Sequence, residues 1–257
     1  MVDRTTPIAQ QLLRLGDIDS AITDYVGAVE TKMAVHPRSK QSRIGPSEIG
    51  VPCDRRIGYK LAGVPGRVQA PSWRAQIGTA VHAWMEAVFD AYNLAHAAEL
   101  GGQERYLVEN RVDLGVVPWL GYRVTGSCDL YDRVTGTVLD HKIVGSAQLK
   151  NYKVNGPSEQ YRVQAHLYGY GWCLAGHPVE TVAIAFWPRN GDLKDVHVWH
   201  EPYSEDTAKN ALSRLSGIAQ AVNLLGDGVF EHLATADSYC GYCPFYKPNA
   251  VSLAEGC

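Results

Sequence analysis

Two aspartates and a lysine, spaced as on β-strands, are the residues of this sequence best able to do chemistry. Residues 124–144 read V-T-G-S-C-D-L-Y-D-R-V-T-G-T-V-L-D-H-K-I-V, and two β-rich runs that flank a turn predict a hairpin. Alternate residues of a strand share a face, so Asp140 and Lys142 should converge with Asp129. Carboxylates bind hard divalent cations, and a nearby lysine can stabilise charge on a phosphoryl group. D-x-K also occurs as two solvated charges at a strand end, so it needs support from the rest of the chain.

A long amphipathic helix is predicted before the hairpin, over residues 72–100, because apolar residues recur there at three- and four-residue spacing. These residues are Ile77, Val81, Trp84, Val88 and Tyr92. His82 and Glu86 lie four positions apart and therefore share a face. A lone histidine on such a helix is more often a core residue than a metal ligand. Glu86 is expected to support a metal ligand without binding the metal itself, or to lie on the surface.

Four of the six cysteines could form a metal centre. Cys240 and Cys243 make a C-x2-C pair, Cys257 follows, and Cys53 lies far upstream. Four thiolates suffice for a tetrahedral zinc ion or for an iron–sulfur cluster, and the spacing alone does not choose between them. The other two cysteines, expected to be buried core thiols, are Cys128 and Cys173.

Further strands and helices must position these side chains. Strands are predicted at residues 105–114, 181–188 and 195–200. Helices are predicted at residues 8–33 with a break near Gly16, at 158–174 and at 204–225. The Pro- and Gly-rich residues 36–52 predict a loop that contains the start of a short helix. Gln164 and Tyr168 form a second pair one helical turn apart, and Glu109 is a charge within a predicted strand to which the pattern assigns no role.

Composition places the chain among ordinary globular proteins. It has 257 residues, 46% hydrophobic residues and a net charge of −3, which argues against bulk attraction to nucleic acid. Charge is uneven, since residues 38–74 carry eight Lys and Arg against two acidic residues. No apolar run approaches the ~18 residues of a membrane span, and the N-terminus lacks a signal-peptide pattern. We therefore expect a cytoplasmic protein without a membrane partner.

Taken together, these motifs resemble the PD-(D/E)XK nucleases, and within that superfamily the RecB-like branch. Cys, His, Asp, D-x-K, Q-x-x-x-Y, C-x2-C and Cys follow one another in the expected order between about residue 44 and residue 257. The cysteines resemble those of the iron–sulfur members: AddB, the CRISPR-associated RecB-family exonucleases and their stand-alone phage relatives. The resemblance implies an α/β fold, a restriction-endonuclease-like core with a mixed sheet flanked by helices and a C-terminal iron–sulfur clasp. It places a nuclease domain at residues 44–257, after an N-terminal helical segment at 1–43.

The activity implied by the resemblance is that of a metal-dependent DNA exonuclease. It would act on single-stranded DNA ends in phage or prokaryotic DNA replication, recombination or repair. Mn2+ or Mg2+ would be held by His82, Asp129, Asp140 and the main-chain carbonyl of His141. Lys142 would orient water or offset charge at phosphorus, and Gln164 and Tyr168 would position the DNA strand.

The resemblance also favours a 4Fe–4S cluster over Zn2+ at Cys53, Cys240, Cys243 and Cys257. Arg55, Arg56 and Lys60 would contact DNA phosphates near this cluster. The chain has no G-x-x-x-x-G-K-[ST] motif and so carries no motor of that class; a helicase or recombination protein is a possible partner. Two alternatives remain open: a catalytically weak DNA-end-binding or spacer-acquisition component of the same fold, and a zinc-stabilised protein in which D-x-K is incidental.

Overall fold

The computed structural model describes residues 18–34, 43–67, 72–236 and 240–257. The chain divides into two compact units, one of residues 1–41 with 69–76 and one of residues 42–68 with 77–257. In the first unit, helix α2 spans Ile18–Ala34 and ends within a residue of the predicted helix. The predicted helix start at residue 8 and the break at Gly16 lie outside the described residues. The boundary proposed between residues 43 and 44 stays a prediction.

The second unit is built on a mixed sheet of five strands, in the order β1-β2-β3-β4-β5. The strands are β1 (Tyr106–Val116), β2 (Arg123–Asp132), β3 (Thr137–Val144), β4 (Thr181–Pro188) and β5 (His197–Pro202). β3 and β4 run parallel, and the other neighbours run antiparallel. The predicted hairpin and the other predicted strands are confirmed, with β5 beginning two residues later than expected.

Because β3 and β4 are parallel, the chain must cross over between them, and two helices make this crossover. They are α6 (Ser146–Asn155) and α7 (Glu159–Leu174). The side chain of Ser158 accepts a hydrogen bond from Tyr161 N and so caps the start of α7. α6 was not predicted, since it buries only Leu149 and Tyr152 and shows too little apolar periodicity.

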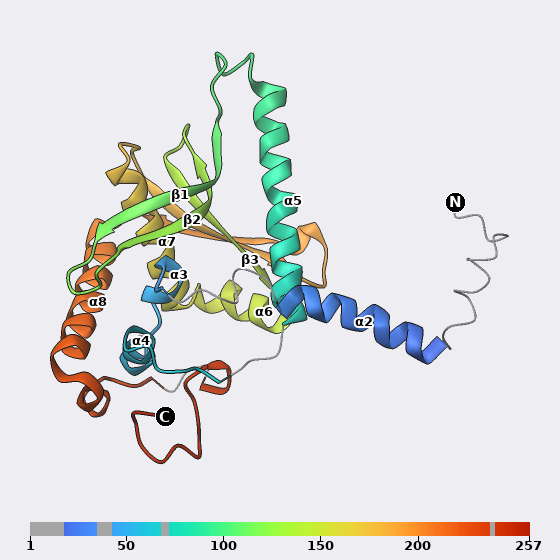
Figure 1. Ribbon diagram of the computed structural model, residues 1–257. Coiled ribbons are helices and arrows are strands. Elements are labelled where there is room, and N and C mark those ends of the chain that lie inside the picture. The colour runs from blue at the N-terminus through green and yellow to red at the C-terminus, as the bar shows by residue number, and fades with distance from the viewer. Residues whose placement is uncertain (1–17, 35–42, 68–71, 237–239) are drawn as a thin grey trace. The chain divides into compact units, whose positions relative to one another are not determined.

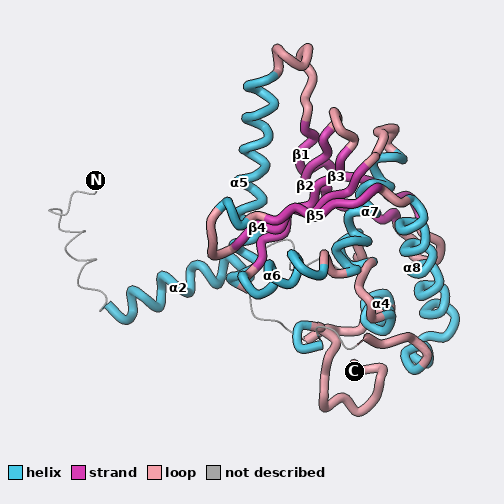
Figure 2. Tube along the Cα trace, turned by 180° about the vertical axis from the view of Figure 1, so that it is seen from behind, coloured by secondary structure: helices cyan, strands magenta, loops and turns pink. Residues whose placement is uncertain are grey.

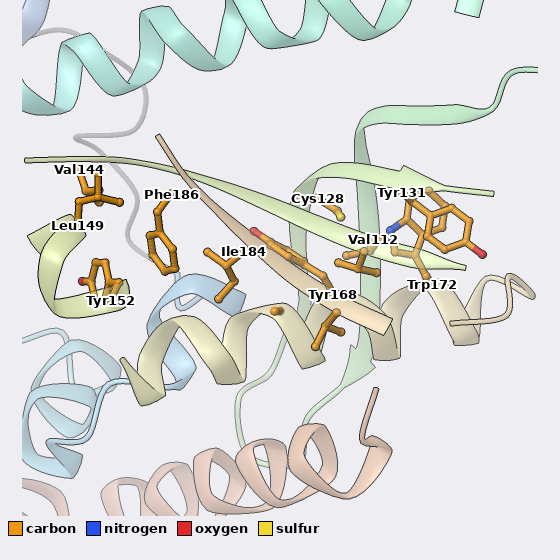
Figure 3. Packing of buried hydrophobic residues seen from close by; sticks show 13 residues of the cluster. Val112, Cys128, Tyr131, Val144, Leu149, Tyr152, Tyr168, Trp172, Ile184 and Phe186 are labelled. Carbon is orange, nitrogen blue, oxygen red and sulfur yellow. The ribbon is translucent and has the colours of Figure 1, made fainter. Parts of the chain in front are cut away.

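Helices cover both faces of the sheet (Figures 1 and 2). α6 and α7 pack on one face over a buried cluster that contains Cys128, Tyr168, Trp172 and Phe186, and Figure 3 shows its side chains between the sheet and these helices. α5, which spans Trp73–His96, lies on the other face. None of the described helices is both long and apolar enough to cross a membrane.

α7 is the central helix of the second unit. Two further helices pack on it and add a layer to this unit: α3 (Pro46–Ile49), which also contacts β2, and α8 (Glu205–Leu225). A second apolar cluster, with Leu167 and Leu215, fills this layer. The prediction that Cys128 is a buried thiol is confirmed, but the same prediction for Cys173 is wrong, because Cys173 is exposed. It lies in the last turn of α7, at the end of the helix.

A third apolar cluster joins the beginning and the end of this unit. Helix α4 (Asp54–Leu61) contributes Tyr59, and the C-terminal segment contributes Cys243 and Phe245. Two short 3-10 helices, η3 (Gly226–Glu231) and η4 (Cys240–Tyr242), lead into this segment. The segment bonds back onto the chain after α4, where Arg67 N donates to Pro244 O at 2.8 Å. α4 and the C-terminal segment lie side by side in both views (Figures 1 and 2).

Candidate active site

A fork between β2 and β3 creates the space for the site. The two strands pair only from Leu130 to Asp132 on β2, opposite Leu139 to Thr137 on β3. Pairing stops immediately before Asp129 and Asp140. Beyond that point a side chain replaces the main-chain pairing: Oδ2 of Asp129 accepts a hydrogen bond of 2.6 Å from His141 N. The fork therefore leaves one carboxylate on each of its arms.

Asp140 is buried, with 1% of its surface exposed, and its two oxygens have different partners. Oδ1 accepts a hydrogen bond of 3.0 Å from Gln164 Nε2 of α7, and Oδ2 forms an ion pair with the ammonium of Lys142. Burial raises the pKa of Asp140 to about 6; Lys142 opposes this rise, and the charge of Asp129 adds to it. Lys142 is itself held 4.9 Å from the ring centroid of Tyr161.

On the opposite face of the sheet, α5 brings His82 to Asp129. His82 Nδ1 lies 3.4 Å from Asp129 Oδ1 and 3.8 Å from Glu109 Oε1. One donor atom from each of the three residues lies within 4.8 Å of the other two, a spacing that suits a shared metal ion. Among the described residues no other group of His, Cys, Asp and Glu meets this criterion.

The charges of this group fit a cation. Burial lowers the pKa of His82, but the carboxylates of Asp129 and Glu109 outweigh it and raise that pKa to about 9. The pKa of Asp129 is held below its usual range by His82 and Lys142, against the effect of burial. His82 Nδ1 is buried, and its approach to the carboxylates lacks the alignment of a hydrogen bond. A divalent ion would give this orphaned nitrogen and the two facing carboxylates a common partner.

Glu109 is the residue that sequence reasoning missed. Its neighbours Val108 and Asn110 pair with Leu130 and Cys128, so Glu109 lies opposite Asp129. Its backbone is in the left-handed region, with a φ of 48°, which L-residues other than Asn and Asp rarely adopt. Strain of this kind collects at functional sites. The signal in the sequence was its charge within an otherwise pleated strand.

Gln164 and Tyr168 are brought to the site, but as buried residues, with 4% and 5% of their surfaces exposed. Gln164 Nε2 donates to the hydroxyl of Tyr168 at 3.2 Å as well as to Asp140. A direct contact with a DNA strand would need more exposed surface than these two side chains have, and their role in positioning the strand stays a prediction. Both support Asp140 from behind.

The remaining predicted residues of the site occupy different positions. Glu86 is exposed on α5 and contributes no atom to the metal group. The ring of His141 stacks on Phe89, with centroids 6.0 Å apart, and accepts a hydrogen bond of 3.4 Å from Trp187 Nε1. What contacts Asp129 is the main-chain N–H of His141; the role of its carbonyl as a metal ligand stays a prediction.

The four cysteines of the predicted centre come together around the third apolar cluster. Cys53 is the residue before α4, Cys240 lies in η4, and Cys243 and Cys257 pack in the cluster or against it. Burial, and after it the charges of Cys243 and Cys53, raises the pKa of Cys257. The sulfurs therefore lie within electrostatic reach of one another.

A glycine turns the chain so that Cys257 can reach this group. Gly256 has a φ of 149°, and a Cβ there would lie 2.6 Å from the carbonyl oxygen of Phe245. The next amide, Cys257 N, donates to that same oxygen at 3.0 Å. A side chain at position 256 would therefore force the last residues away from the other cysteines.

The basic residues assigned to DNA are mostly engaged within the protein. The ammonium of Lys60 binds both carboxylate oxygens of Glu48, at 2.7 and 2.6 Å, and its contact with DNA phosphates stays a prediction. Arg55 lowers the pKa of Cys257 by its charge and so lies beside the thiols. Arg56 is partly exposed, and its contact with DNA stays a prediction.

Comparison with known proteins assigns the chain to a family. Residues 93–247, more than half of the chain, match the family model of the PD-(D/E)XK nuclease superfamily. The chain belongs to this superfamily of nucleases, as its motifs predicted, and its helix-flanked mixed sheet is the α/β core expected of a restriction-endonuclease-like fold. The match includes Glu109, Asp129, Asp140 and Lys142, and His82 lies before it.

Solved structures with a partial likeness to this chain include that of SSO0001 and two structures of one alkaline exonuclease. The crystal structure of SSO0001 is 15% identical, with a TM-score of 0.45, and the match covers 87% of this chain and 94% of that one. An alkaline exonuclease, LHK-Exo from Laribacter hongkongensis, is 10% identical with a TM-score of 0.45, over 76% of this chain and 93% of that one. A second structure of LHK-Exo, in complex with dAMP, has a TM-score of 0.33 at 9% identity and covers 73% and 93%. No curated protein matches the sequence.

Proposed function

We propose that this nuclease is a DNA exonuclease that depends on a divalent metal ion and acts on single-stranded DNA ends. The observation that carries the metal dependence is the fork between β2 and β3, where Asp129 and Asp140 face each other beside Lys142 and the His82–Glu109–Asp129 group. The preference for single-stranded ends rests on the sequence resemblance. A phosphodiester is hydrolysed slowly in water, so the site must activate water and stabilise negative charge.

The ion is assigned to His82, Glu109, Asp129 and Asp140. When bound, a divalent cation supplies an activated water and neutralises charge on the phosphate. Oxygen ligands suit Mg2+ and Mn2+, and the imidazole of His82 favours Mn2+. Asp129 lies between the other carboxylates and is the residue best placed to serve two ions. Because the apo pKa of His82 is about 9, its ring must release a proton before it can act as a ligand at neutral pH.

Lys142 and the buried pair on α7 perform different tasks. The ammonium of Lys142 would move from its ion pair with Asp140 toward the phosphate as charge builds in the transition state. Gln164 holds Asp140 Oδ1 through a hydrogen bond of 3.0 Å and so fixes the direction in which Oδ2, the oxygen paired with Lys142, points. Tyr168 in turn fixes the amide of Gln164. These two residues position a ligand.

The second part of the proposal is an iron–sulfur cluster at Cys53, Cys240, Cys243 and Cys257. A zinc ion with four sulfurs at about 2.3 Å requires sulfurs only ~3.8 Å apart. Although all four cysteines belong to the described residues, no three of their sulfurs lie mutually within 4.8 Å. The preference for an iron–sulfur cluster over a single zinc ion rests on the sequence resemblance. The colour and the iron and sulfide content of anaerobically purified protein test this directly.

The activity is tested with the full chain and end-labelled DNA. Single- and double-stranded oligonucleotides, linear or circular, are incubated with Mn2+, Mg2+ or EDTA, and the products are resolved by length. We expect stepwise shortening of linear single strands with Mn2+, and no cleavage with EDTA. Cleavage of circular single strands would refute the requirement for ends, and binding without cleavage would favour the alternative of a DNA-end-binding component.

Asp140→Ala is the matched loss-of-function variant for this assay. The substitution removes a carboxylate whose burial is unfavourable for its charged form, so the variant should still fold. The activation free energy of cleavage should rise by several kcal/mol. Asp113→Asn is the control, since Asp113 lies on β1 in an exposed ion pair with Arg123. Full cleavage by folded Asp140→Ala would remove the catalytic assignment.

A further inference from the structure

Two buried hydrogen-bond donors beside the four cysteines have no partner among the residues that the structure describes. The hydroxyl of Tyr59 is buried and unbonded, and the whole residue is 0% exposed. Nε of Arg55, one turn earlier on α4, is likewise buried and unbonded. An unpaired buried donor costs roughly 1–3 kcal/mol, so two of them in adjacent turns of one helix call for an explanation.

Both donors are close to the thiols. Tyr59 packs in one cluster with Cys243, and Cys257 packs against it. Burial raises the pKa of Tyr59 to about 12, and the charges of Cys257, Cys53 and Cys243 act in the same direction. Arg55 acts on both Tyr59 and Cys257 with the opposite sign. The two donors and the sulfurs thus form one electrostatic group.

The surroundings of the Tyr59 ring are aromatic. The phenol ring is enclosed by aromatic rings, with Phe230 at 4.4 Å and Phe245 at 5.4 Å between centroids. If this core held only neutral groups, phenylalanine would be more stable than tyrosine at position 59, because it has no hydroxyl to leave unpaired. A centre of four thiolates is anionic, by contrast, and its sulfurs accept hydrogen bonds that offset their charge.

We propose that Arg55 Nε–H and Tyr59 O–H donate hydrogen bonds to sulfur atoms of the metal–thiolate centre held by Cys53, Cys240, Cys243 and Cys257. This inference rests on the centre assigned under the proposed function. Arg55 therefore belongs to the cluster rather than to DNA. Hydrogen bonds to sulfur stabilise the more negative, reduced state of a cluster, so both residues raise its reduction potential. They also strengthen the hold on the metal.

The structure supplies matched controls for both residues. Tyr203 also has a buried hydroxyl without a hydrogen-bond partner, but it packs against the cluster under the sheet. Arg56 is the neighbour of Arg55 on α4. Tyr59→Phe and Tyr203→Phe each remove one oxygen and keep the ring, and Arg55→Lys and Arg56→Lys keep the charge and remove the guanidinium.

The experiment uses the full chain, purified without oxygen. Iron, sulfide and zinc are counted, the potential is titrated with dithionite and followed by visible absorption, and metal loss to a chelator is timed. We expect Tyr59→Phe and Arg55→Lys to bind metal at the wild-type stoichiometry, with a more negative midpoint and faster metal loss. A tenfold weaker preference for the reduced state corresponds to about 59 mV for one electron. Tyr203→Phe and Arg56→Lys should match the wild type.

The outcomes separate this inference from the centre itself. If the wild type contains no metal, or if Cys53→Ser retains a full complement, the centre is refuted and the inference with it. If the centre is present and both test variants match their controls in midpoint and in metal loss, the inference alone is refuted. If the metal is zinc, the rate of its loss to the chelator is the readout, and the same comparison of variants with controls decides.

Discussion

Replacing Glu109 by asparagine tests the residue that geometry, rather than sequence, adds to the metal group. The variant removes the carboxylate that lies with His82 and Asp129 inside a 4.8 Å triangle. Asparagine tolerates the left-handed backbone at this position better than glutamate does. The matched control is Asp113→Asn on the same strand, where the carboxylate pairs with Arg123 at the surface.

The expected effect on the metal-free protein is small and can be worked out from the distances. With an effective dielectric constant near 20, protonated His82 at 3.8 Å attracts Glu109 by about 4 kcal/mol. Asp129, within 4.8 Å, repels it by about 3.5 kcal/mol or more. The two terms nearly cancel. Relief of the left-handed strain then leaves the variant more stable by about 1 kcal/mol, or roughly 2–4 °C in Tm for a domain of this size.

In the presence of metal, the wild type should instead be more stable than Glu109→Asn. A ligand at one hundred times its Kd stabilises a folded protein by about 2.7 kcal/mol, and the variant should lose most of that gain because its site lacks one carboxylate. Thermal melts in EDTA and over a Mn2+ titration measure both quantities, with calorimetry for the Kd. We expect Glu109→Asn to melt at or above the wild type in EDTA and below it in Mn2+.

The reasoning is refuted if Glu109→Asn gains as much stability from Mn2+ as the wild type does. A loss of the Mn2+ effect in Asp113→Asn would also refute it, since the effect would then follow from any charge removed from β1. A variant that is much less stable than the wild type in EDTA would show that the strain argument for Glu109 is wrong.

Three other predictions concern the rest of the site and the cysteines. Lys142→Ala should bind Mn2+ in calorimetry but cleave DNA on the order of 10²–10³ times more slowly, and loss of metal binding would give Lys142 a structural role. Cys53→Ala should lose iron and thermal stability, whereas Cys128→Ala and Cys173→Ala should keep their iron; the reverse result contradicts the four-cysteine assignment. The pKa of His82 in the metal-free fold, about 9, lies above the ~6.5 of an exposed histidine, so its contribution to stability is present below pH 6.5 and is lost as pH rises to 9. Mn2+ affinity should rise over the same range, because binding releases a proton from His82. Calorimetry in buffers of different ionisation enthalpy measures this proton, and a binding enthalpy that does not depend on the buffer would contradict the prediction.

The regular elements were predictable where the sequence repeats a period. The hairpin, β4, α7 and α8 each carry a clear alternation or helical stripe, and each lies within two residues of its expected bounds. The proximity of Asp140 and Lys142 followed from strand alternation. His82 and the cysteines needed the order of several motifs, because each is uninformative by itself.

What could not be predicted depends on contacts between distant segments. Nothing local in the sequence shows that β2 and β3 separate at Asp129, or that the pairing of β1 with β2 places Glu109 opposite Asp129. Lys60 reads as a free cation, yet it is bound by Glu48 from the preceding helix. Gln164 reads as one residue of an amphipathic pair, but α7 is covered from both sides and its polar groups are internal. In each case the partner is supplied by tertiary packing.

The fork also makes one junction of the sheet weaker than another. Between Leu130 and Asp132 a short ladder is all the strand pairing that joins the β1–β2 hairpin to β3, whereas β3 and β4 pair along their whole length. Short ladders open at a lower free-energy cost than long ones and exchange their amide hydrogens sooner. An ion held by carboxylates from both arms, as proposed above, would cross-link the two sides of this hinge. Amide exchange in β2 should therefore slow when metal binds. Strands β1 and β2 should become rigid relative to β3 only in the metal-bound protein.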